Sequence, residues 1–337
     1  MPRDNQVWRL SSRPAGSIAE GDLRFSEEER PTVSDGQFLY ELLYLSLDPT
    51  NRIWMSDMDQ YMEPVALGDV MRGVVCGRVL DSRKPGIAPG DIVSGLGGWA
   101  RYQISDGSSI AKFNGYGELP LPDAFGMFAV VGPTAYFGLV DIGNPKAGET
   151  VVVSAAAGAV GSIAGQIAKI KGCRVVGLAG TEAKCAWIKD ELSFDAAINY
   201  KTADLARALR DACPNGIDIY FDNTGGPILD AVLGQVNLRA RIPTCGLISM
   251  YNSPQPVPGP YHYANILMKR VRVEGFIVLD YYARYPEAIA ALAEWMKEGR
   301  LKHRLDVVEG LEKAGTAVCR LFTGENNGKL LVRVKSD

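Results

Sequence analysis

Two patterns of apolar and polar positions follow one another along the chain. From Thr150 onward, short β-branched runs are each followed by a segment that repeats apolar residues with a helical period. The predicted strands are Thr150–Ser154, Arg174–Leu178, Ala196–Asn199, Ile217–Phe221, Arg241–Ser249 and Arg272–Val278; the predicted helices are Val160–Lys171, Glu182–Leu192, Asp204–Ala212, Pro227–Gln235 and Ala283–Glu298. This alternation predicts an α/β fold with a doubly wound parallel sheet of the Rossmann type.

The first third of the chain has short apolar runs separated by glycine and proline turns. The strands predicted there are Gln37–Leu47, Met71–Leu80, Asp91–Ser94 and Trp99–Ile104. Such a segment predicts an antiparallel, barrel-like domain, with the acidic run Glu27–Glu29 on a solvated surface. The apolar stretch Phe125–Ile142 contains Pro133 and predicts a broken helix, while Leu330–Val334 predicts a strand that completes the first domain.

These patterns predict two domains. The first is mostly β and spans residues 1–124, completed by residues 303–337. The second is the Rossmann domain and spans residues 125–302.

Composition and charge exclude several classes of protein. The net charge of −3 gives no reason to expect a nucleic acid or an anionic membrane as partner. No uninterrupted apolar run has the length of a membrane span, and residues 1–6 lack the apolar core of a signal peptide. We therefore expect a cytoplasmic protein that binds neither nucleic acid nor membrane.

The residues that commonly bind metals are scattered. The six cysteines form no C-x-x-C pair, and the two histidines, His262 and His303, are far apart in the sequence. A zinc enzyme needs three convergent protein ligands and an open position. The sequence thus predicts reduced thiols and no metal site.

A glycine-rich turn joins the first predicted Rossmann strand to its helix. The residues read Ala156-x-Gly158-x-x-Gly161, with alanine in place of the usual first glycine. Small residues allow the backbone to approach a pyrophosphate, and the start of the helix favours negative charge. On its own the turn is equally consistent with a packing turn that binds nothing. Its position between strand and helix favours a dinucleotide site.

The end of the second Rossmann strand indicates which dinucleotide is bound. An acidic residue there would accept from the ribose 2′-hydroxyl of NAD and repel a 2′-phosphate. Here the strand ends in Ala179-Gly180-Thr181; Glu182 falls in the first helical turn and Lys184 follows. A neutral strand end with a nearby lysine favours NADPH; the less favoured alternative is that Lys184 is an exposed helix lysine.

Several motifs recur together in one known family. They are Leu45–Pro49, Ala155–Gly161, Ala179–Thr181 with Lys184, Asn199–Lys201, Phe221–Gly226, Cys245–Asn252 and Glu325–Lys329. Together they resemble the zinc-independent branch of the medium-chain dehydrogenase/reductases, in the group of prostaglandin reductases, plant double-bond reductases and bacterial curcumin reductases. The resemblance implies a GroES-like first domain, a Rossmann domain and a C-terminal return to the first domain.

The resemblance also implies a set of residues that bind NADPH. Gly158–Gly161 would hold the pyrophosphate, Lys184 and Tyr200 the 2′-phosphate, and the backbone of Phe276–Val278 the nicotinamide carboxamide. The full implied set is Gly158, Ala159, Val160, Gly161, Gly180, Lys184, Tyr200, Asn223, Cys245, Gly246, Ser249, Tyr251, Phe276, Ile277, Val278 and Asn327. On local grounds alone, Phe276 would be a core residue and Asn327 part of a hairpin turn.

Reduction of an enone delivers hydride to the β-carbon while charge develops on the carbonyl oxygen. Catalysis therefore needs a fixed geometry and a hydrogen-bond donor aimed at that oxygen. By the resemblance, Tyr251 faces the substrate, so we predict it as the catalytic donor; a ribose hydroxyl of the cofactor is the alternative. The family usually has a tyrosine where this chain has Thr50, followed by Asn51.

That departure leaves the substrate open. The candidates for substrate contact are Asn51, Tyr61 and Tyr263, beside Tyr44, Trp54 and the rest of the Tyr261–Tyr263 cluster, and spacing does not choose among them. Gly68–Gly73 stands where zinc-dependent relatives carry a G-H-E ligand motif, and the histidine is absent.

The leading hypothesis is an NADPH-dependent reductase of the C=C bond of α,β-unsaturated ketones and aldehydes. The alternatives are an NADPH-dependent quinone oxidoreductase and an NADPH-binding protein without turnover. The resemblance further implies a homodimer that forms through the edge of the Rossmann sheet.

Overall fold

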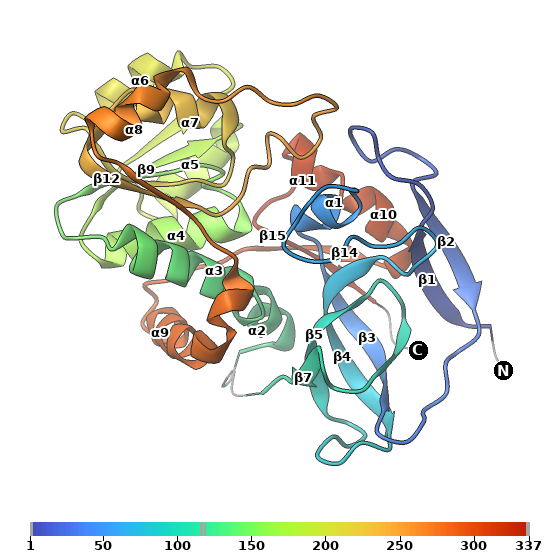
Figure 1. Cartoon of the computed structure of the whole chain (residues 1–337). Coiled ribbons are helices and arrows are strands. Elements are labelled where there is room, and N and C mark those ends of the chain that lie inside the picture. Colours follow the sequence, from blue (N-terminus) through green and yellow to red (C-terminus); the bar gives the residue numbers. More distant parts are fainter. Residues whose placement is uncertain (1–2, 115–116, 118, 335–337) are drawn as a thin grey trace. The chain divides into compact units, whose positions relative to one another are not determined.

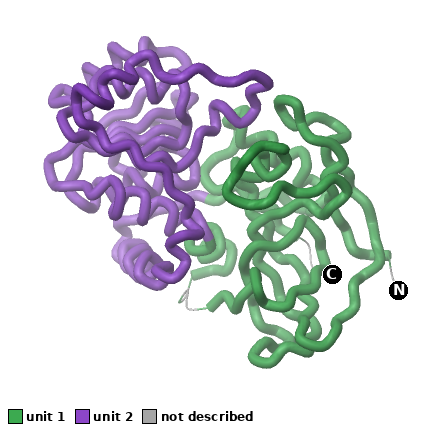
Figure 2. The backbone as a smooth tube through the Cα atoms, viewed as in Figure 1, with its two compact units in different colours: residues 1–129, 305–337 green, residues 130–304 purple. Residues whose placement is uncertain are grey.

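The computed structural model describes residues 3–114, 117 and 119–334. The chain forms two compact units, residues 1–129 with 305–337, and residues 130–304 (Figure 2). The first is called unit 1 and the second unit 2. Both boundaries lie a few residues beyond those that the sequence patterns predict.

Unit 2 is built on a parallel six-stranded sheet with the order β10-β9-β8-β11-β12-β13. Its strands are β8 (Thr150–Val153), β9 (Arg174–Ala179), β10 (Ala196–Asn199), β11 (Ile217–Phe221), β12 (Val236–Thr244) and β13 (Arg272–Gly275). The chain winds outward from β8 in one direction and from β11 in the other. This confirms the doubly wound Rossmann sheet and places its switch point between β8 and β11, where such sheets bind their ligands.

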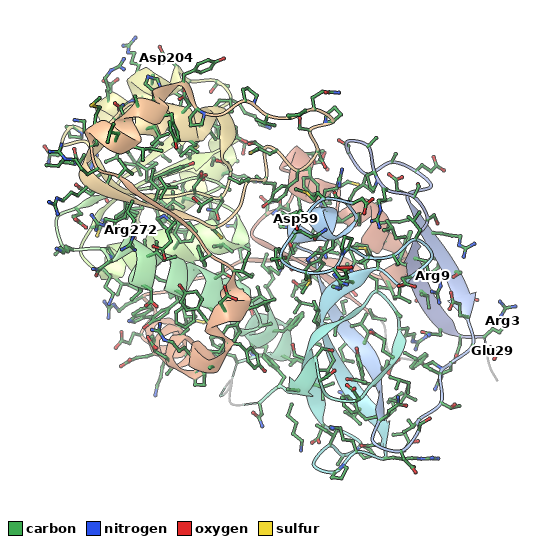
Figure 3. All side chains as sticks on the ribbon, in the orientation of Figure 1. Arg3, Arg9, Glu29, Asp59, Asp204 and Arg272 are labelled. Atoms are coloured by element: carbon green, nitrogen blue, oxygen red, sulfur yellow. The ribbon has the colours of Figure 1, made fainter. Side chains whose placement is uncertain are left out.

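Helices cover both faces of this sheet (Figure 1). They are α4 (Ala159–Ile170), α5 (Glu182–Asp190), α6 (Leu205–Ala212) and α7 (Gly226–Leu233), followed by η2 (Tyr261–Tyr263), α8 (Ala264–Met268), η3 (Val278–Arg284) and α9 (Tyr285–Lys297). Leu209 of α6 and Val232 of α7 are buried against strand residues such as Val152. The side chain of Asp204 (Figure 3) accepts from the Arg207 N–H at 3.1 Å and so caps α6.

Two predicted strands have the wrong limits. β12 begins at Val236, five residues before the predicted Arg241, and ends at Thr244, five residues before the predicted Ser249. The Cys245 N–H makes the last ladder bond, to the Asp222 carbonyl oxygen, and the Gly246 N–H donates to the same oxygen, so the chain leaves the ladder there. β13 ends at Gly275 instead of Val278, where η3 begins. At their carboxyl ends, both predicted strands extend into a loop at the carboxyl edge of the sheet.

The predicted broken helix is confirmed as α2 (Leu121–Phe128), α3 (Val131–Phe137) and a final π-helical segment, η1 (Gly138–Gly143). The break at residues 129–130 follows from Pro133, which has no N–H for the Ala129 carbonyl four residues earlier. By length and composition Leu121–Gly143 could span a membrane, contrary to our reading of its apolar run. However, 72% of its most apolar window is buried, as expected of core helices.

Unit 1 contains a seven-stranded sheet with the order β14-β15-β3-β4-β5-β7, in which β6 also pairs with β3. These strands are β3 (Phe38–Ser46), β4 (Arg72–Ser82), β5 (Ile92–Gly98), β6 (Tyr102–Ser105), β7 (Ile110–Lys112), β14 (Leu305–Glu309) and β15 (Lys329–Arg333). Short helices join them: α1 (Thr50–Trp54), η4 (Leu311–Lys313), α10 (Ala314–Ala317) and α11 (Arg320–Thr323). β15 pairs antiparallel with β3, so the C-terminal segment completes the first domain as predicted.

A separate hairpin in unit 1 was not predicted. It consists of β1 (Asn5–Leu10) and β2 (Leu23–Glu28). Glu28 lies in β2 and forms an ion pair with Arg9 at 2.7 Å, whereas Glu27 and Glu29 are exposed. The predicted solvated surface therefore holds for Glu27 and Glu29, whereas the carboxylate of Glu28 links β2 to β1 through its ion pair with Arg9. Figure 3 labels both Arg9 and Glu29.

Candidate functional site

The turn between β8 and α4, residues 154–161, is called the phosphate cradle here. Gly158 is the extended N-cap residue of α4, and Ala155 takes the left-handed conformation with φ 47°. A Cβ on Gly161 would collide with the Ala155 carbonyl oxygen, so only glycine allows the helix to pack this closely on the turn. Small residues and a helix N-terminus at the carboxyl edge of the sheet fit a pyrophosphate.

The alanine at the first glycine position is accommodated without strain. Ala156 is fully buried, and its own φ is not positive because Ala155 takes the left-handed conformation instead. The departure from the usual glycine motif therefore leaves the shape of the cradle intact.

The loop after β11 is attached directly to this cradle. The Asn223 N–H donates to Ser154 Oγ at 2.9 Å, and Asn223 Nδ2 donates to the Ser154 carbonyl oxygen at 2.7 Å. These two bonds span the switch point between β8 and β11. The structure thus brings Asn223 to the same sheet edge as Gly158–Gly161, as the family resemblance implies.

Asp222 fixes that loop and was not identified from the sequence. It is fully buried, and its Oδ1 accepts from the N–H groups of Thr224 at 2.9 Å and Gly225 at 2.8 Å and from the Tyr220 hydroxyl at 2.9 Å. Burial raises the pKa of the Asp222 carboxyl above its ordinary value. The signal available in the sequence was Asp before Asn-Thr-Gly-Gly, a pattern typical of side-chain-stabilised turns.

The loop that carries Tyr251 lies against the Asp222 loop. Ser249 Oγ donates to the Thr224 carbonyl oxygen at 2.5 Å, and the Tyr251 hydroxyl oxygen accepts from the Leu247 N–H at 2.9 Å. Burial raises the pKa of the Cys245 thiol to about 12, so this cysteine is a neutral packing residue at physiological pH. Cys245, Gly246, Ser249 and Tyr251 therefore lie in one loop, next to Asn223.

Phe276–Val278 follow β13 at the same sheet edge. The Phe276 ring packs against the backbone of Gly138, where a Cβ would collide with it, and meets Phe221 edge-on at 6.5 Å between ring centroids. Val278 is buried, and the Ile277 carbonyl accepts from the Asp280 N–H at 3.1 Å. The Phe276 side chain is thus half-buried and used in packing within unit 2.

Residues predicted for the 2′-phosphate meet at the ends of β9 and β10. The Tyr200 N–H donates to the Ala179 carbonyl oxygen at 3.2 Å, and Thr181 caps α5 by accepting from the Lys184 N–H at 3.2 Å. Burial raises the pKa of Tyr200, which keeps its hydroxyl protonated and able to donate. Glu182 is turned toward β10, since its Oε1 accepts from Asn199 Nδ2 at 2.7 Å.

In unit 1, the segment beside Thr50 is held by hydrogen bonds. Asn51 is 1% exposed; its Oδ1 accepts from the Asp48 N–H at 2.8 Å and its Nδ2 donates to the Arg72 carbonyl at 3.2 Å. Both ends of this side chain are therefore used to fix the turn, a placement that disfavours the predicted contact of Asn51 with substrate.

Tyr61 is placed differently from Asn51. Its side chain is 41% exposed, its hydroxyl is hydrogen-bonded to Thr50 Oγ1, and the same oxygen accepts from Trp54 Nε1 at 3.0 Å. Burial of the hydroxyl end raises the pKa of Tyr61. The chain thus presents an aromatic ring directly beside Thr50, which the sequence alone could not locate.

The two remaining candidates lie on exposed segments. Tyr263 is 67% exposed in η2, which is attached to α7 through the His262 N–H and Asp230 Oδ1 at 2.8 Å. Asn327 precedes β15 in unit 1, and its N–H donates to Asp306 Oδ2 at 3.0 Å. Within residues 3–114, 117 and 119–334, no three His, Cys, Asp or Glu side chains are grouped so that they could hold a metal ion.

A parallel sheet with a phosphate cradle at its switch point, in a chain that also has a mostly β unit, is typical of two-domain dinucleotide-binding proteins. Two family models match the chain: "N-terminal domain of oxidoreductase" over residues 6–113 and "Zinc-binding dehydrogenase" over residues 159–294.

Characterised relatives match over almost the whole chain. NADPH-dependent curcumin reductase of Escherichia coli (strain K12) is 43% identical over 99% of this chain and 98% of its own. The NADP⁺-dependent 2-alkenal reductase of Nicotiana tabacum is 43% identical over 88% of this chain and 86% of its own. The crystal structure of CurA in complex with NADPH from Vibrio vulnificus matches with a TM-score of 0.93 and 42% identity, covering 98% of this chain and 100% of that one.

The chain therefore belongs to the medium-chain dehydrogenase/reductases, in the group of curcumin, prostaglandin and 2-alkenal reductases.

Proposed function

We propose that this protein is an NADPH-dependent reductase of the C=C bond of α,β-unsaturated ketones and aldehydes. The observation that carries the proposal is the near-complete match to a relative named NADPH-dependent curcumin reductase. The phosphate cradle and the neutral end of β9 agree with it, because they suit a dinucleotide with a 2′-phosphate.

Unit 2 binds the cofactor in this proposal. Gly158–Gly161 hold the pyrophosphate at the N-terminus of α4, and Lys184 and Tyr200 bind the 2′-phosphate beside Gly180. Asn223, the Cys245–Tyr251 loop and the backbone of Phe276–Val278 line the nicotinamide end, and the family resemblance adds Asn327 to the cofactor-binding residues. In support, every one of these unit 2 residues lies after the carboxyl end of a strand of the same sheet.

NADPH supplies the hydride that adds to the β-carbon of the substrate, and a proton from solvent completes the saturated ketone. The protein's task is to orient the enone and to stabilise charge on its carbonyl oxygen. Tyr251 performs the second task by donating its hydroxyl hydrogen. In support, the oxygen of this hydroxyl accepts from the Leu247 N–H, which fixes its position within the loop that follows β12.

Tyr61 lines the substrate side in unit 1. Its exposed ring supplies the aromatic surface, and Thr50 and Trp54 fix its hydroxyl. Asn51 acts as a positioning residue, because its side chain holds the turn that carries Thr50.

An assay with two oxidants tests the reaction. NADPH consumption is followed with a simple alkenone, 3-penten-2-one, and in parallel with 1,4-benzoquinone. We expect turnover of the alkenone to its saturated ketone. Turnover of the quinone alone would establish the alternative, a quinone oxidoreductase, and binding of NADPH without oxidation across a panel of enones would establish a non-catalytic binding protein.

We further propose that two copies associate through the edge of the unit 2 sheet. β13 is an edge strand whose four residues are exposed, and the preceding segment exposes Tyr263, Leu267 (74%) and Met268 (61%). An exposed edge strand beside apolar side chains is suited to pairing with a second chain. In this proposal Tyr263 contacts the second copy of the chain and not the cofactor.

Light scattering on the eluting protein tests the dimer. We expect twice the chain mass for the native protein and a single chain for Val273→Lys, which places a charge on the edge strand. A native protein that elutes as a single chain would contradict the proposal. We also expect the protein in the cytoplasmic fraction of the cell, in agreement with its six free cysteines.

A further inference from the structure

The ends of β9 and β10 hold a second lysine that the family resemblance does not assign to the cofactor. The two strands run parallel with Asn199 opposite Ala179, so Gly180 and Tyr200 continue side by side. Lys201 comes next in the chain. Its side chain turns back over the end of β9 instead of pointing away from the sheet.

Gly180 marks the point where these side chains meet. A carbon atom placed at its Cβ position would lie 3.2 Å from Lys201 Cε and 3.2 Å from the Tyr200 hydroxyl. The ammonium nitrogen is one bond of about 1.5 Å beyond Cε, so it lies within about 5 Å of the same point. An ammonium group and a protonated phenol therefore adjoin the neutral strand end together.

The charge of Lys201 is not neutralised by the protein. Among the described residues, Lys201 has no ion pair. Glu182, which follows Gly180 by two positions, is hydrogen-bonded to Asn199 instead. Asn199 accounts for this arrangement: its Nδ2 donates to Glu182 Oε1 at 2.7 Å, and its Oδ1 accepts from the Lys201 N–H at 3.2 Å. One amide side chain thus holds the Glu182 carboxylate and the backbone of Lys201.

We propose that Lys201 is a further ligand of the 2′-phosphate and that Asn199 is its positioning residue. A phosphomonoester carries a charge of about −1.5 to −2 at neutral pH, which a single lysine does not balance. Lys201 and Lys184 together match it, and the Tyr200 hydroxyl adds a neutral donor. Asn199 keeps Glu182 directed at β10, away from the phosphate. This inference rests on the 2′-phosphate site proposed above.

Binding of adenosine 2′,5′-bisphosphate, compared with 5′-AMP, isolates the contribution of the 2′-phosphate from all catalytic steps. Isothermal titration of Lys201→Ala is expected to weaken the bisphosphate about 10- to 100-fold, the range of a lost charge-assisted hydrogen bond, and to leave 5′-AMP unchanged. Lys201→Arg should retain most of the affinity. The dependence of the dissociation constant on salt should also become shallower in Lys201→Ala.

The matched control is Lys189→Ala, since Lys189 is an exposed lysine near the other end of α5. If Lys201→Ala behaves like this control while Lys184→Ala and Tyr200→Phe weaken the bisphosphate selectively, the inference on Lys201 is wrong and the proposed site stands. If none of the three variants separates the bisphosphate from 5′-AMP, the proposed 2′-phosphate site itself is wrong.

The role of Asn199 has its own test. Asn199→Ala releases Glu182 and should weaken the bisphosphate several-fold, whereas the double variant Asn199→Ala/Glu182→Gln should recover most of that loss. A double variant as weak as Asn199→Ala, or a single variant without effect, would overturn the role of Asn199 in directing Glu182.

Discussion

Each of the two units contains a buried sheet, but the segments that connect paired strands differ greatly in length between the two units. In unit 2, neighbouring strands are joined by a helix and a short loop, so each ligand-binding segment is a few residues long and directly follows its strand. In unit 1, strands that are distant in the sequence also pair: Leu331 of β15 lies opposite Ser46 of β3. Residues of unit 2 can thus be assigned by local rules, whereas those of unit 1 depend on contacts between remote segments.

The largest expected effect concerns the unit 2 loop. Tyr251→Phe should lower the turnover of an enone by roughly 10²–10³, as for a lost donor in an oxyanion hole, with little change in NADPH affinity. Steady-state kinetics together with a cofactor titration make this measurement. Tyr282→Phe is the control, because Tyr282 is 63% exposed in the same unit. An unaltered turnover number would transfer the role to a ribose hydroxyl of the cofactor.

The next effect tests the phosphate cradle. Gly161→Ala places a methyl group against the Ala155 carbonyl oxygen and should destabilise unit 2 by about 1–3 kcal/mol, with a parallel loss of NADPH affinity. Thermal unfolding and cofactor titration report both. Gly259→Ala serves as comparison, since a Cβ there meets nothing within 4 Å. Equal behaviour of the two variants would show that the close packing at Gly161 is unimportant.

The sequence predicted unit 2 well because its signals are local. The strand–turn–helix order at Gly158–Gly161 and the neutral end of β9 are read within about ten residues, and the predicted family and Rossmann fold are confirmed. The error at β12 occurs where the Gly246 N–H bonds to the carbonyl of a distant residue, Asp222, and the error at β13 occurs just before η3 begins. Asp222 itself was missed because a buried carboxylate in a turn resembles any other Asx turn.

Unit 1 was predicted less well, for the opposite reason. The hairpin β1–β2 and the strands β7 and β14 were missed, since each of these strands depends on pairing with a segment outside its own short window. For the same reason, spacing could not choose among the aromatic residues near Thr50. The contact of Tyr61 with Thr50 arises from the fold of the intervening segment, which brings positions 50 and 61 together.

A smaller effect is expected at this contact. Tyr61→Phe removes the hydrogen bonds to Thr50 and Trp54 and should raise the KM for an enone roughly 2- to 10-fold, the range for lost neutral hydrogen bonds, with turnover number nearly retained. Tyr102→Phe, a buried tyrosine on β6, is the control. A KM equal to that of the native protein would remove Tyr61 from the substrate side.

The smallest effect belongs to the hairpin of unit 1. Hydrogen bonding to Arg9 holds the pKa of Glu28 below its ordinary value, so this pair contributes stability above the unfolded pKa of 4.5 and loses it as the pH falls through the lower folded pKa. Glu28→Gln should therefore cost roughly 0.5–1 kcal/mol at pH 7 and less at pH 3. Urea unfolding at the two pH values measures this difference, and a cost that is the same at both would contradict the assignment.

The central claim is that the cofactor's hydride reaches the carbon β to a carbonyl. The most direct measurement uses NADPH deuterated at the transferable position of the nicotinamide, with 3-penten-2-one as substrate and NMR of the product. The account predicts a saturated ketone, 2-pentanone, with deuterium only on the carbon β to the carbonyl. Deuterium on the carbinol carbon of an alcohol product would contradict this prediction. So would the absence of a deuterated product from the enone while a parallel reaction consumes 1,4-benzoquinone.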